Sequence, residues 1–203
     1  MKRIVLATRN EAKRAELERM LAGLPVQVRG LRDYPDVPPL PEEGHTYEAN
    51  ARSKALTVAR YLNEVALADD SGLEVDYLEG RPGVQSARFL GEDATDEDRN
   101  REVLRLLEGV PPENRTARYR AVVAVAFPDG QVYTFEGTCE GAIALEPRGT
   151  GGFGYDPIFY VPELDRTVAE LTPQEKDLIS HRGQAMRKAR EFLLRVLGER
   201  RGA

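Results

Sequence analysis

The sequence contains very little cysteine and histidine and has no long hydrophobic segment. One cysteine and two histidines occur among 203 residues. The single cysteine, Cys139, excludes an internal disulfide bond, and these residues lack the ligand spacing of a zinc site. Cys139 lies in a strand-like stretch without a nearby histidine to activate it, so we expect a small buried core residue. No segment approaches the roughly 18 apolar residues of a membrane-spanning helix, which favours a soluble globular protein.

The chain also lacks an excess of positive charge. It has 29 lysines and arginines against 34 acidic residues, which gives a formal net charge of −5. A general nucleic-acid-binding protein presents a basic field to the phosphate backbone, so the composition argues against that class and we expect no nucleic-acid partner. A small anionic substrate is compatible with this charge, because the local arrangement of charges governs a binding cleft.

The first ten residues, MKRIVLATRN, combine basic residues with a short apolar run, as a signal peptide does. The run from Ile4 to Ala7 is too short for the hydrophobic region of a signal peptide, and polar residues follow it at once. The segment is better interpreted as a first buried strand. We therefore expect a cytoplasmic protein that does not enter a membrane.

Alternating strand and helix patterns predict an α/β fold. An antiparallel hairpin combined with β-helix-β units makes the expected sheet mixed. No repeat or low-complexity linker divides the chain, so we expect a single domain with two lobes over residues 1–203. The expected elements are strands at 2–8 and 25–30, helices at 10–23, 46–63 and 96–109, a hairpin at 116–145 with its turn at Pro128-Asp129-Gly130, and a long helix that starts after Ser180.

Two adjacent acids, Asp69 and Asp70, interrupt the apolar stretch ALADDSGLEV. Because aspartate is a poor strand residue, we expect a DDSG turn between two strands. Ligands of α/β sheets usually bind at strand ends, and paired carboxylates there can hold Mg²⁺ with a phosphate or deprotonate a water. The alternative is a polar turn in which the aspartates cap backbone N–H groups.

The segment TRNEAK, residues 8–13, joins the first strand to the first helix. Free N–H groups and the positive end of the helix dipole make such a junction a phosphate-binding position. Lys13, one turn into the helix, can reach the same anion. The alternative is that Asn10 caps the helix while Lys13 is solvated.

The segment GTGGFG, residues 149–154, matches the dinucleotide fingerprint GxGxxG. A turn and a strand follow it instead of a helix, and it lacks the Lys-Ser/Thr of a P-loop, so both cofactor folds are excluded. A glycine loop still lets backbone approach a ligand closely, and Phe153 and Tyr155 can stack on a base. The alternative is a tight turn with two core aromatic residues.

Basic side chains gather at the start of the C-terminal helix. Ser180 is the expected N-cap, which places His181 and Arg182 in the first helical turn, where cations oppose the helix dipole. An anionic or carbonyl-bearing ligand explains these cations and the nearby Lys176. His45 lies in a proline-rich loop, and we expect it to be exposed.

Taken together, these motifs resemble those of the inosine/xanthosine triphosphate pyrophosphatase family. Its members hydrolyse deaminated purine nucleoside triphosphates to a monophosphate and pyrophosphate. The resemblance implies a long mixed β-sheet flanked by helices, two lobes with a central cleft, Mg²⁺ dependence and a homodimer. The matching segments occur in family order over nearly the whole chain: VLATRNEAK, EEGHTYEANARSKA, ADDSGLEVDYLEGRPGVQSAR, GEDATD, GTGGFGYDPIF and ELTPQEKDLISHRGQA.

The resemblance also implies roles for individual residues. Asp70 is the general base or a metal ligand, Asp69 supports it, and Glu42 is the second metal ligand, although the alignment leaves Glu43 open. Arg9 stands where glycine is common, so it either contacts a phosphate or points to solvent. The residues implied for the triphosphate are Thr8, Arg9, Asn10, Glu11, Ala12, Lys13, Lys54, Ser71 and Lys176, and those implied for the base are Phe153, Gly154, Tyr155, Asp156, His181 and Arg182.

In the implied reaction, Mg²⁺ bridges Asp70, Glu42 and phosphate oxygens, and a water oriented by Asp70 attacks. The neighbouring aspartates tolerate each other because a cation binds beside them, so one should have a raised pKa without metal. Two other functions remain open. One is a pyrophosphatase for modified pyrimidine or standard triphosphates, and the other is a non-catalytic nucleotide-binding regulator.

Overall fold

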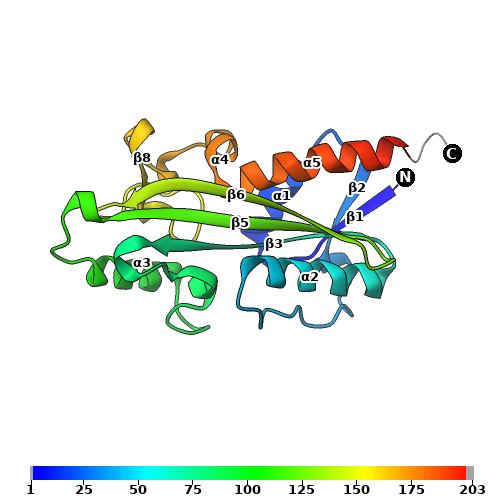
Figure 1. The fold of residues 1–203 in the computed structure, drawn as a ribbon, viewed down its shortest axis with the longest axis horizontal. Helices are drawn as coiled ribbons and strands as arrows, with labels where there is room; N and C mark the ends of the chain where they lie inside the picture. Colours follow the sequence, from blue (N-terminus) through cyan, green and yellow to red (C-terminus); the bar gives the residue numbers. More distant parts are fainter. Residues whose placement is uncertain (1, 200–203) are drawn as a thin grey trace. The chain divides into compact units, whose positions relative to one another are not determined.

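The computed structural model describes residues 2–199 and has the predicted α/β class. Eight strands form one sheet in the order β2-β1-β3-β5-β6-β7-β8, and β4 pairs with β3 (Figure 1). β1 is parallel to β2 and β3, whereas the β3–β4, β6–β7 and β7–β8 pairs are antiparallel, so the sheet is mixed as predicted. The strands are β1 (Lys2–Leu6), β2 (Val26–Gly30), β3 (Val65–Val75), β4 (Arg81–Pro82), β5 (Thr116–Ala126), β6 (Val132–Ile143), β7 (Phe159–Val161) and β8 (Arg166–Thr167).

Five α-helices accompany the sheet. They are α1 (Glu11–Met20), α2 (Tyr47–Leu62), α3 (Asp96–Leu106), α4 (Pro173–Ile179) and α5 (His181–Glu199). The first two begin where their N-caps predict. The Asn10 side chain accepts the Lys13 N–H at 3.0 Å, and Thr46 Oγ1 accepts the Ala49 N–H at 3.1 Å. Each cap satisfies a backbone donor that has no partner within its helix. Within residues 2–199, no helix has the length and apolar character needed to cross a membrane.

The predicted turn at DDSG is wrong. β3 runs without interruption from Val65 to Val75, and Asp69 and Asp70 are ordinary members of the strand. Successive strand residues point to opposite faces of a sheet, so the two carboxylates diverge. Aspartate is unfavourable in a strand when its charge has no partner. Here each acid meets cations from other elements, which removes the reason to expect a turn.

The chain divides into two compact units. Unit 1 contains Met1–Asp70, Ala121–Gly137 and Arg182–Ala203, and unit 2 contains Ser71–Arg120 and Thr138–His181. Residues 1 and 200–203, which the predicted single domain includes, lie outside the described part of the chain. Three chain segments build unit 1 and two build unit 2, so side chains far apart in sequence are neighbours within each unit.

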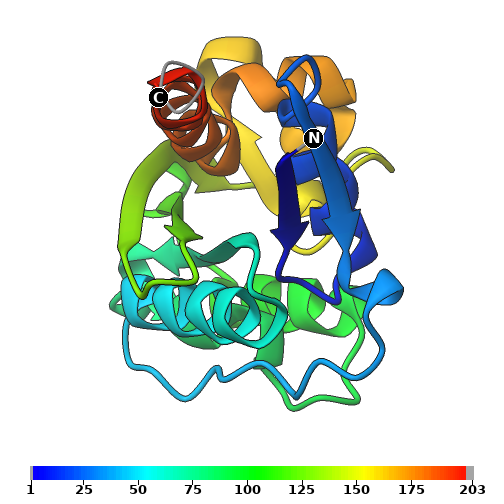
Figure 2. The ribbon, with the colours of Figure 1, turned by 90° about the vertical axis from the view of Figure 1, so that its right-hand side faces the viewer.

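In unit 1, helices cover both faces of the strands. One core cluster joins Ile4 and Leu6 of β1 to Leu17 of α1 and to Ala185 and Leu193 of α5. The alternate strand residues point to the other face, where α2 lies (Figures 1 and 2). The acids of β3 therefore face α1 and α5 on one side of the sheet and α2 on the other.

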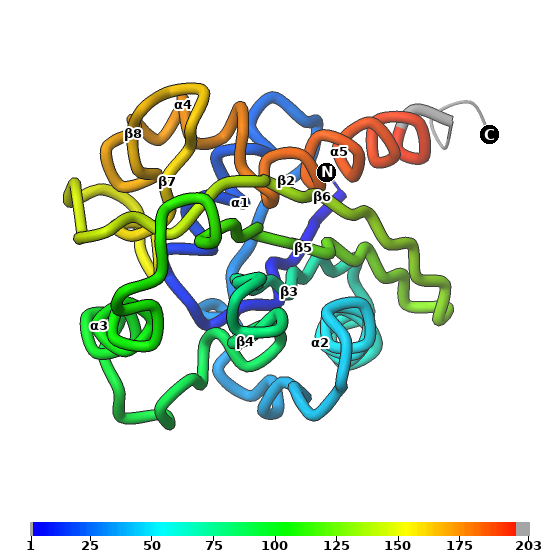
Figure 3. The backbone as a smooth tube through the Cα atoms, turned by 60° about the vertical axis from the view of Figure 1, so that its left-hand side comes forward, coloured from blue at the N-terminus to red at the C-terminus, as the bar shows by residue number. Residues whose placement is uncertain are grey.

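In unit 2, a second core cluster surrounds the strand ends. It includes Leu73 of β3, Val103 of α3, Tyr119 of β5 and Phe159 of β7. Cys139 belongs to this cluster, and burial is the largest cause that raises the pKa of its thiol to about 11, which confirms the predicted core role. β7, β8 and α4 lie next to one another (Figure 3), and Arg166 of β8 pairs with Glu175 of α4 at 2.6 Å.

Candidate active site

Asp69 is the most deeply buried acid of β3, with 1% of its surface exposed. Its Oδ2 accepts a hydrogen bond from Arg182 Nε at 3.0 Å and lies 3.5 Å from Lys13 Nζ. Burial acts to raise the pKa of Asp69, but the attraction of Lys13 and Arg182 outweighs it and holds the pKa well below its usual range. Asp69 is therefore an ionised carboxylate that binds two cations.

Arg182 lies inside this cluster. Its guanidinium is 2% exposed, and Nη1 donates to Glu16 Oε2 at 2.6 Å while Nε binds Asp69. Burial opposes the charge of Arg182, yet the two acids raise its pKa. Arg182 thus orients the Asp69 carboxylate. The predicted contact of Arg182 with a base stays a prediction. Sequence reasoning missed Glu16, although its position three residues after Lys13 places both on one helix face.

Asp70 points to the opposite side, toward α2. Its Oδ2 accepts from Asn50 Nδ2 at 3.0 Å, and its Oδ1 lies 3.8 Å from Lys54 Nζ. Burial raises the pKa of Asp70 more than Lys54, Lys13 and the Asn50 hydrogen bond lower it, so the pKa lies above the usual carboxyl value. This confirms the expectation that one of the two aspartates has a raised pKa, and it makes Asp70 the stronger base of the pair.

Asn50 connects Asp70 to the loop before α2. It is buried, and its side-chain oxygen accepts the Gly44 N–H at 2.8 Å. A Cβ atom at Gly44 would lie only 2.6 Å from that oxygen, so the approach requires glycine. The sequence analysis did not select Asn50, although it precedes Lys54 by one helical turn and the two share a face of α2.

Lys54 joins the two predicted metal ligands. Its ammonium lies 3.1 Å from Glu42 Oε1 and 3.8 Å from Asp70 Oδ1. Glu42 and Asp70 thus converge on one cation. Both Glu42 and Glu43 are exposed, and the contact of Glu42 with Lys54 favours Glu42 of the two alternatives.

The donor set fits Mg²⁺ bound together with a phosphate. Within residues 2–199, no group of three or more His, Cys, Asp or Glu side chains could hold a metal by itself. Mg²⁺ is commonly held by one or two carboxylates and substrate phosphates, with water completing its octahedron. Asp70 and Glu42 provide such a pair. Asp69 Oδ1 is also buried and has no hydrogen-bond partner in the described part of the chain, so it can accept a further donor or ligand.

The TRNEAK junction is an ordered cap with one inward-facing cation. Asn10 caps α1 as described, and Thr8 Oγ1 accepts the Asn10 N–H at 3.1 Å. The alternative of a solvated Lys13 does not hold, because its side chain faces Asp69 and is 15% exposed. Arg9 is exposed, and its Nη2 donates to the Val37 carbonyl at 2.9 Å; its contact with a phosphate stays a prediction. The junction therefore brings Lys13 to the buried acids and ties Arg9 to the proline-rich loop.

The next two residues of the junction contribute less side-chain chemistry. Glu11 is exposed and forms ion pairs with Arg14 and Arg32. Its carboxylate would repel a phosphate, and Ala12 has no polar side-chain atom, so any phosphate contact at these two residues would come from their backbone N–H groups. His45, as expected, is exposed.

In unit 2, Asp156 organises the glycine loop. Its Oδ1 accepts from the Tyr119 hydroxyl at 2.9 Å, and its Oδ2 accepts from Lys176 Nζ at 2.7 Å and the Phe153 N–H at 3.0 Å. The Lys176 ammonium lies 4.5 Å from the centre of the Phe153 ring, within cation–π range. Asp156, Lys176 and Phe153 therefore form one cluster. Sequence reasoning selected all three but placed Lys176 with the triphosphate.

Two other predicted base-binding residues are buried in unit 2. Tyr155 belongs to the core, and its hydroxyl donates to the Ser86 carbonyl at 2.8 Å, which favours the alternative of a core aromatic residue over stacking on a base. His181 stacks on Tyr119 with ring centres 4.5 Å apart.

Ser71, which the resemblance implies for the triphosphate, is half-buried and is the first β3 residue of unit 2.

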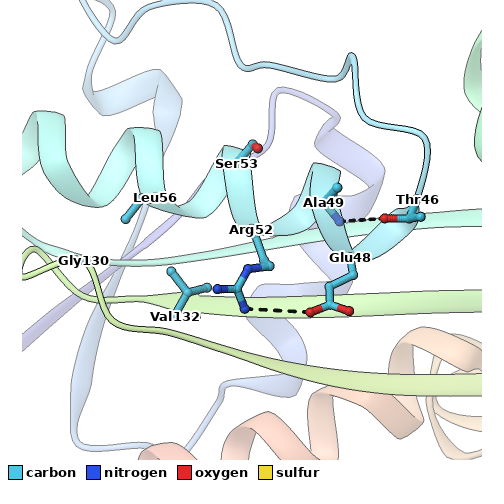
Figure 4. Close-up of a pocket in the computed structure, with 8 residues that line it drawn as sticks. All are labelled: Thr46, Glu48, Ala49, Arg52, Ser53, Leu56, Gly130 and Val132. Carbon is cyan, nitrogen blue, oxygen red and sulfur yellow. Dashed lines mark hydrogen bonds and ion pairs between the residues drawn. The ribbon is translucent and has the colours of Figure 1, made fainter.

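A separate pocket of about 480 Å³ lies in unit 1 between α2 and the chain from Gly130 to Val132, where β6 begins (Figure 4). Glu48 and Arg52 form an ion pair at its rim, with 3.8 Å between Oε1 and Nη1. Asn50 and Lys54 follow Glu48 and Arg52 by two positions each, about 200° further around the helix, so they point away from this ion pair. The pocket is lined by Thr46, Glu48, Ala49, Arg52, Ser53, Leu56, Gly130 and Val132.

Comparisons with known proteins agree with this fold over almost its full length. The family model described as the Ham1 family matches residues 4–192. The structure of a HAM1 protein from Coxiella burnetii aligns with a TM-score of 0.87 and 43% identity, covering 96% of this chain and all of that chain. The Ham1 protein of Staphylococcus aureus aligns with a TM-score of 0.84 and 39% identity, covering 95% of this chain and 98% of its own.

Curated relatives are similarly close. A dITP/XTP pyrophosphatase of Desulforamulus reducens is 52% identical over 194 residues, which cover 96% of each chain. A dITP/XTP pyrophosphatase of Geobacter sulfurreducens is 49% identical over 193 residues, covering 95% of this chain and 97% of the relative. Since the family model and these relatives both span nearly the whole sequence, the chain belongs to the Ham1 family.

Proposed function

We propose that this chain is a pyrophosphatase that hydrolyses non-standard purine nucleoside triphosphates, namely ITP, dITP and XTP, to the nucleoside monophosphate and pyrophosphate. Removal of these nucleotides would cleanse the nucleotide pool. The relatives' name, dITP/XTP pyrophosphatase, supports the substrate class. The observation that carries the chemistry is the convergence of the Asp70 and Glu42 carboxylates on the Lys54 ammonium, at 3.8 and 3.1 Å. The predicted homodimer and cytoplasmic location stay predictions.

The chain's own residues divide the work on the phosphates. Lys13 and Lys54 supply positive charge to a polyanion, which lowers the electrostatic barrier to an attacking water. Asp70 accepts the proton of that water. The Asn50 amide fixes the orientation of the Asp70 carboxylate through its 3.0 Å hydrogen bond.

We propose Mg²⁺ as the cofactor, held by Asp70 and Glu42 with phosphate oxygens. When bound, it supplies Lewis-acid polarisation of the phosphates and neutralises charge on the leaving pyrophosphate. Lys54, which contacts both carboxylates, keeps their oxygens directed at one point.

Base selection would depend on the purine 6-position. Inosine and xanthosine carry a 6-oxo acceptor, whereas adenosine carries an amino donor. N–H donors of the glycine loop, His181 or Arg182 would pair with the oxo group and face the amino group unfavourably. An unpaired buried polar group costs about 1–3 kcal/mol, and several such mismatches multiply the discrimination.

A substrate panel tests this function. Pyrophosphate release from ITP, XTP, dITP, GTP, ATP and dTTP is measured by a coupled pyrophosphatase assay, with Mg²⁺ and with EDTA. We expect turnover of ITP, dITP and XTP well above that of ATP and dTTP, and its loss in EDTA. Equal rates across the panel would support the broad-specificity alternative. Tight ITP binding without turnover would support a nucleotide-binding regulator.

A further inference from the structure

Helix α3 holds the glycine loop at one residue. The Gly154 N–H donates to Asp96 Oδ2 at 2.8 Å, and Asn100 Nδ2 donates to the Gly154 carbonyl at 3.1 Å. Asp96 and Asn100 are four residues apart and so lie on one face of the helix. Both bonds join parts of the chain more than fifty residues apart, so they are tertiary contacts rather than local turn geometry.

The two bonds fix the backbone on both sides of one Cα atom. The N–H belongs to the peptide between Phe153 and Gly154, and the carbonyl belongs to the peptide between Gly154 and Tyr155. Gly154 has φ +62°, a left-handed conformation that glycine adopts without strain but that is not preferred over its alternatives. The contacts from α3 therefore select this conformation from the many that glycine allows.

The end of α3 that makes these contacts is itself anchored. Thr95 and Asp98 form a capping box at its first turn, with Thr95 Oγ1 accepting the Asp98 N–H at 3.1 Å. Arg99, which is buried, donates to the carbonyls of Phe89 and Gly91 at 2.9 and 3.0 Å. The helix start is a fixed support against which the loop can be held.

Packing alone does not hold the loop against α3. A cavity of about 520 Å³ lies between them, lined by Asn100 and Leu104 of the helix and by residues 149–154 of the loop. Without the two hydrogen bonds, the loop has room to move toward the helix. Phe153, which directly precedes Gly154, belongs to the Asp156 cluster. Its N–H donates to Asp156 Oδ2, and its ring contacts the Lys176 ammonium.

We propose that Asp96 and Asn100 are positioning residues that act through Gly154 to hold Phe153 and Asp156 in the arrangement that binds the purine base. This inference rests on the proposed function, because that function makes the base the ligand of this loop. Neither residue needs to touch the nucleotide. Asp96 and Asn100 both occur in the stretch DEDRN, whose charge alone indicates only a solvated helix face.

Paired variants test the inference. Asp96→Ala removes the acceptor, while Asp96→Asn keeps a side-chain oxygen and should rescue it. Asn100→Asp keeps the shape but removes the donor. Arg105→Ala is the matched control, because Arg105 is an exposed residue of the same helix that pairs with Glu102 and does not line the cavity.

We expect Asp96→Ala and Asn100→Asp to raise KM for ITP about 3- to 10-fold, the effect of one lost hydrogen bond, with a smaller change in kcat. The reason is that the base lies away from the reacting phosphates, so a loosened loop weakens binding more than chemistry. Asp96→Asn and Arg105→Ala should stay near the wild type. Thermal melting of every variant shows whether it is folded.

Hydrogen exchange over residues 149–157 gives a readout that does not depend on turnover. Asp96→Ala and Asn100→Asp should accelerate exchange there, whereas Arg105→Ala should not. Exchange and KM both equal to those of Arg105→Ala would overturn the positioning role, as would faster exchange with an unchanged KM. A wild type that does not hydrolyse ITP would instead overturn the proposed function, and the base-positioning role with it.

Discussion

Asp69 and Asp70 are adjacent on β3, yet their carboxylates face opposite sides of the sheet and their pKa values shift in opposite directions. Asp69 meets Lys13 and Arg182, whose attraction outweighs burial. Asp70 meets one lysine at 3.8 Å and an amide, and there burial prevails. The alternation along the strand thus gives the two carboxylates different nearest partners, so Asp69 is an ionised anion between two cations and Asp70 has a raised pKa in the metal-free protein.

Replacement of Asp70 by asparagine should remove catalysis while the fold persists. Asparagine is isosteric and can still accept the Asn50 hydrogen bond, but it cannot take a proton from water. We expect kcat for ITP to fall by at least about 100-fold, the usual contribution of a general base. Steady-state kinetics check this, with far-ultraviolet circular dichroism as the test of folding.

The matched control is Asp36→Asn, an exposed aspartate of the proline-rich loop. It removes the same charge from the same unit and should leave kcat unchanged. An Asp70→Asn enzyme with wild-type kcat would remove Asp70 from the mechanism.

The same Asp70→Asn variant should be more stable than the wild type in metal-free buffer at pH 7. A carboxyl group whose pKa is raised in the folded state binds protons more tightly there than in the unfolded chain. Its ionisation therefore costs stability as the pH rises above its ordinary pKa of 3.8. Asparagine removes that cost. We expect a higher Tm by differential scanning fluorimetry in EDTA, with the gain shrinking toward pH 4.

Sequence patterns were sufficient for the elements whose causes are local. Asn10 and Thr46 each cap a helix three residues before the N–H that they accept, so the helix starts were predictable. The hairpin turn after β5 also follows from its Pro-Asp-Gly triplet. Such features depend on neighbours within one turn of chain, which a single sequence displays directly.

The errors concern residues whose partners are distant in the sequence. The sequence predicts a turn at Asp69 because it does not show that the hydrogen-bond partner of Asp69, Arg182, lies 113 residues away. It leaves Tyr155 open between a base-binding and a core role because the partner of the Tyr155 hydroxyl, the Ser86 carbonyl, is 69 residues away. Charge and aromaticity identified both as special residues, but tertiary contacts decide which partner satisfies them, and periodicity carries no information about those.

Replacement of Lys13 by alanine should weaken phosphate binding. Lys13 is the cation of the first helix that faces the acids of β3, and a hydrogen bond to a charged group contributes about 1.5–3 kcal/mol. We expect kcat/KM for ITP to fall about 10- to 100-fold. The control is Lys188→Ala, because the ammonium of Lys188 donates to the Glu136 carbonyl at the surface. Equal kcat/KM for both variants would exclude Lys13 from the substrate site.

Asp69→Asn should have the opposite effect on stability from Asp70→Asn. Removal of the Asp69 charge leaves Arg182 and Lys13 without their shared carboxylate, and breaking a buried ion pair costs about 3–5 kcal/mol. Because the folded-state pKa of Asp69 is lowered, its contribution is complete above the ordinary pKa of 3.8 and is lost as the pH falls below that value. Urea unfolding from pH 7 to pH 3 should show Asp69→Asn well below the wild type at neutral pH, with the difference narrowing only at the acid end. A loss of stability that is the same at every pH would mean that Asp69 acts through packing rather than through its charge.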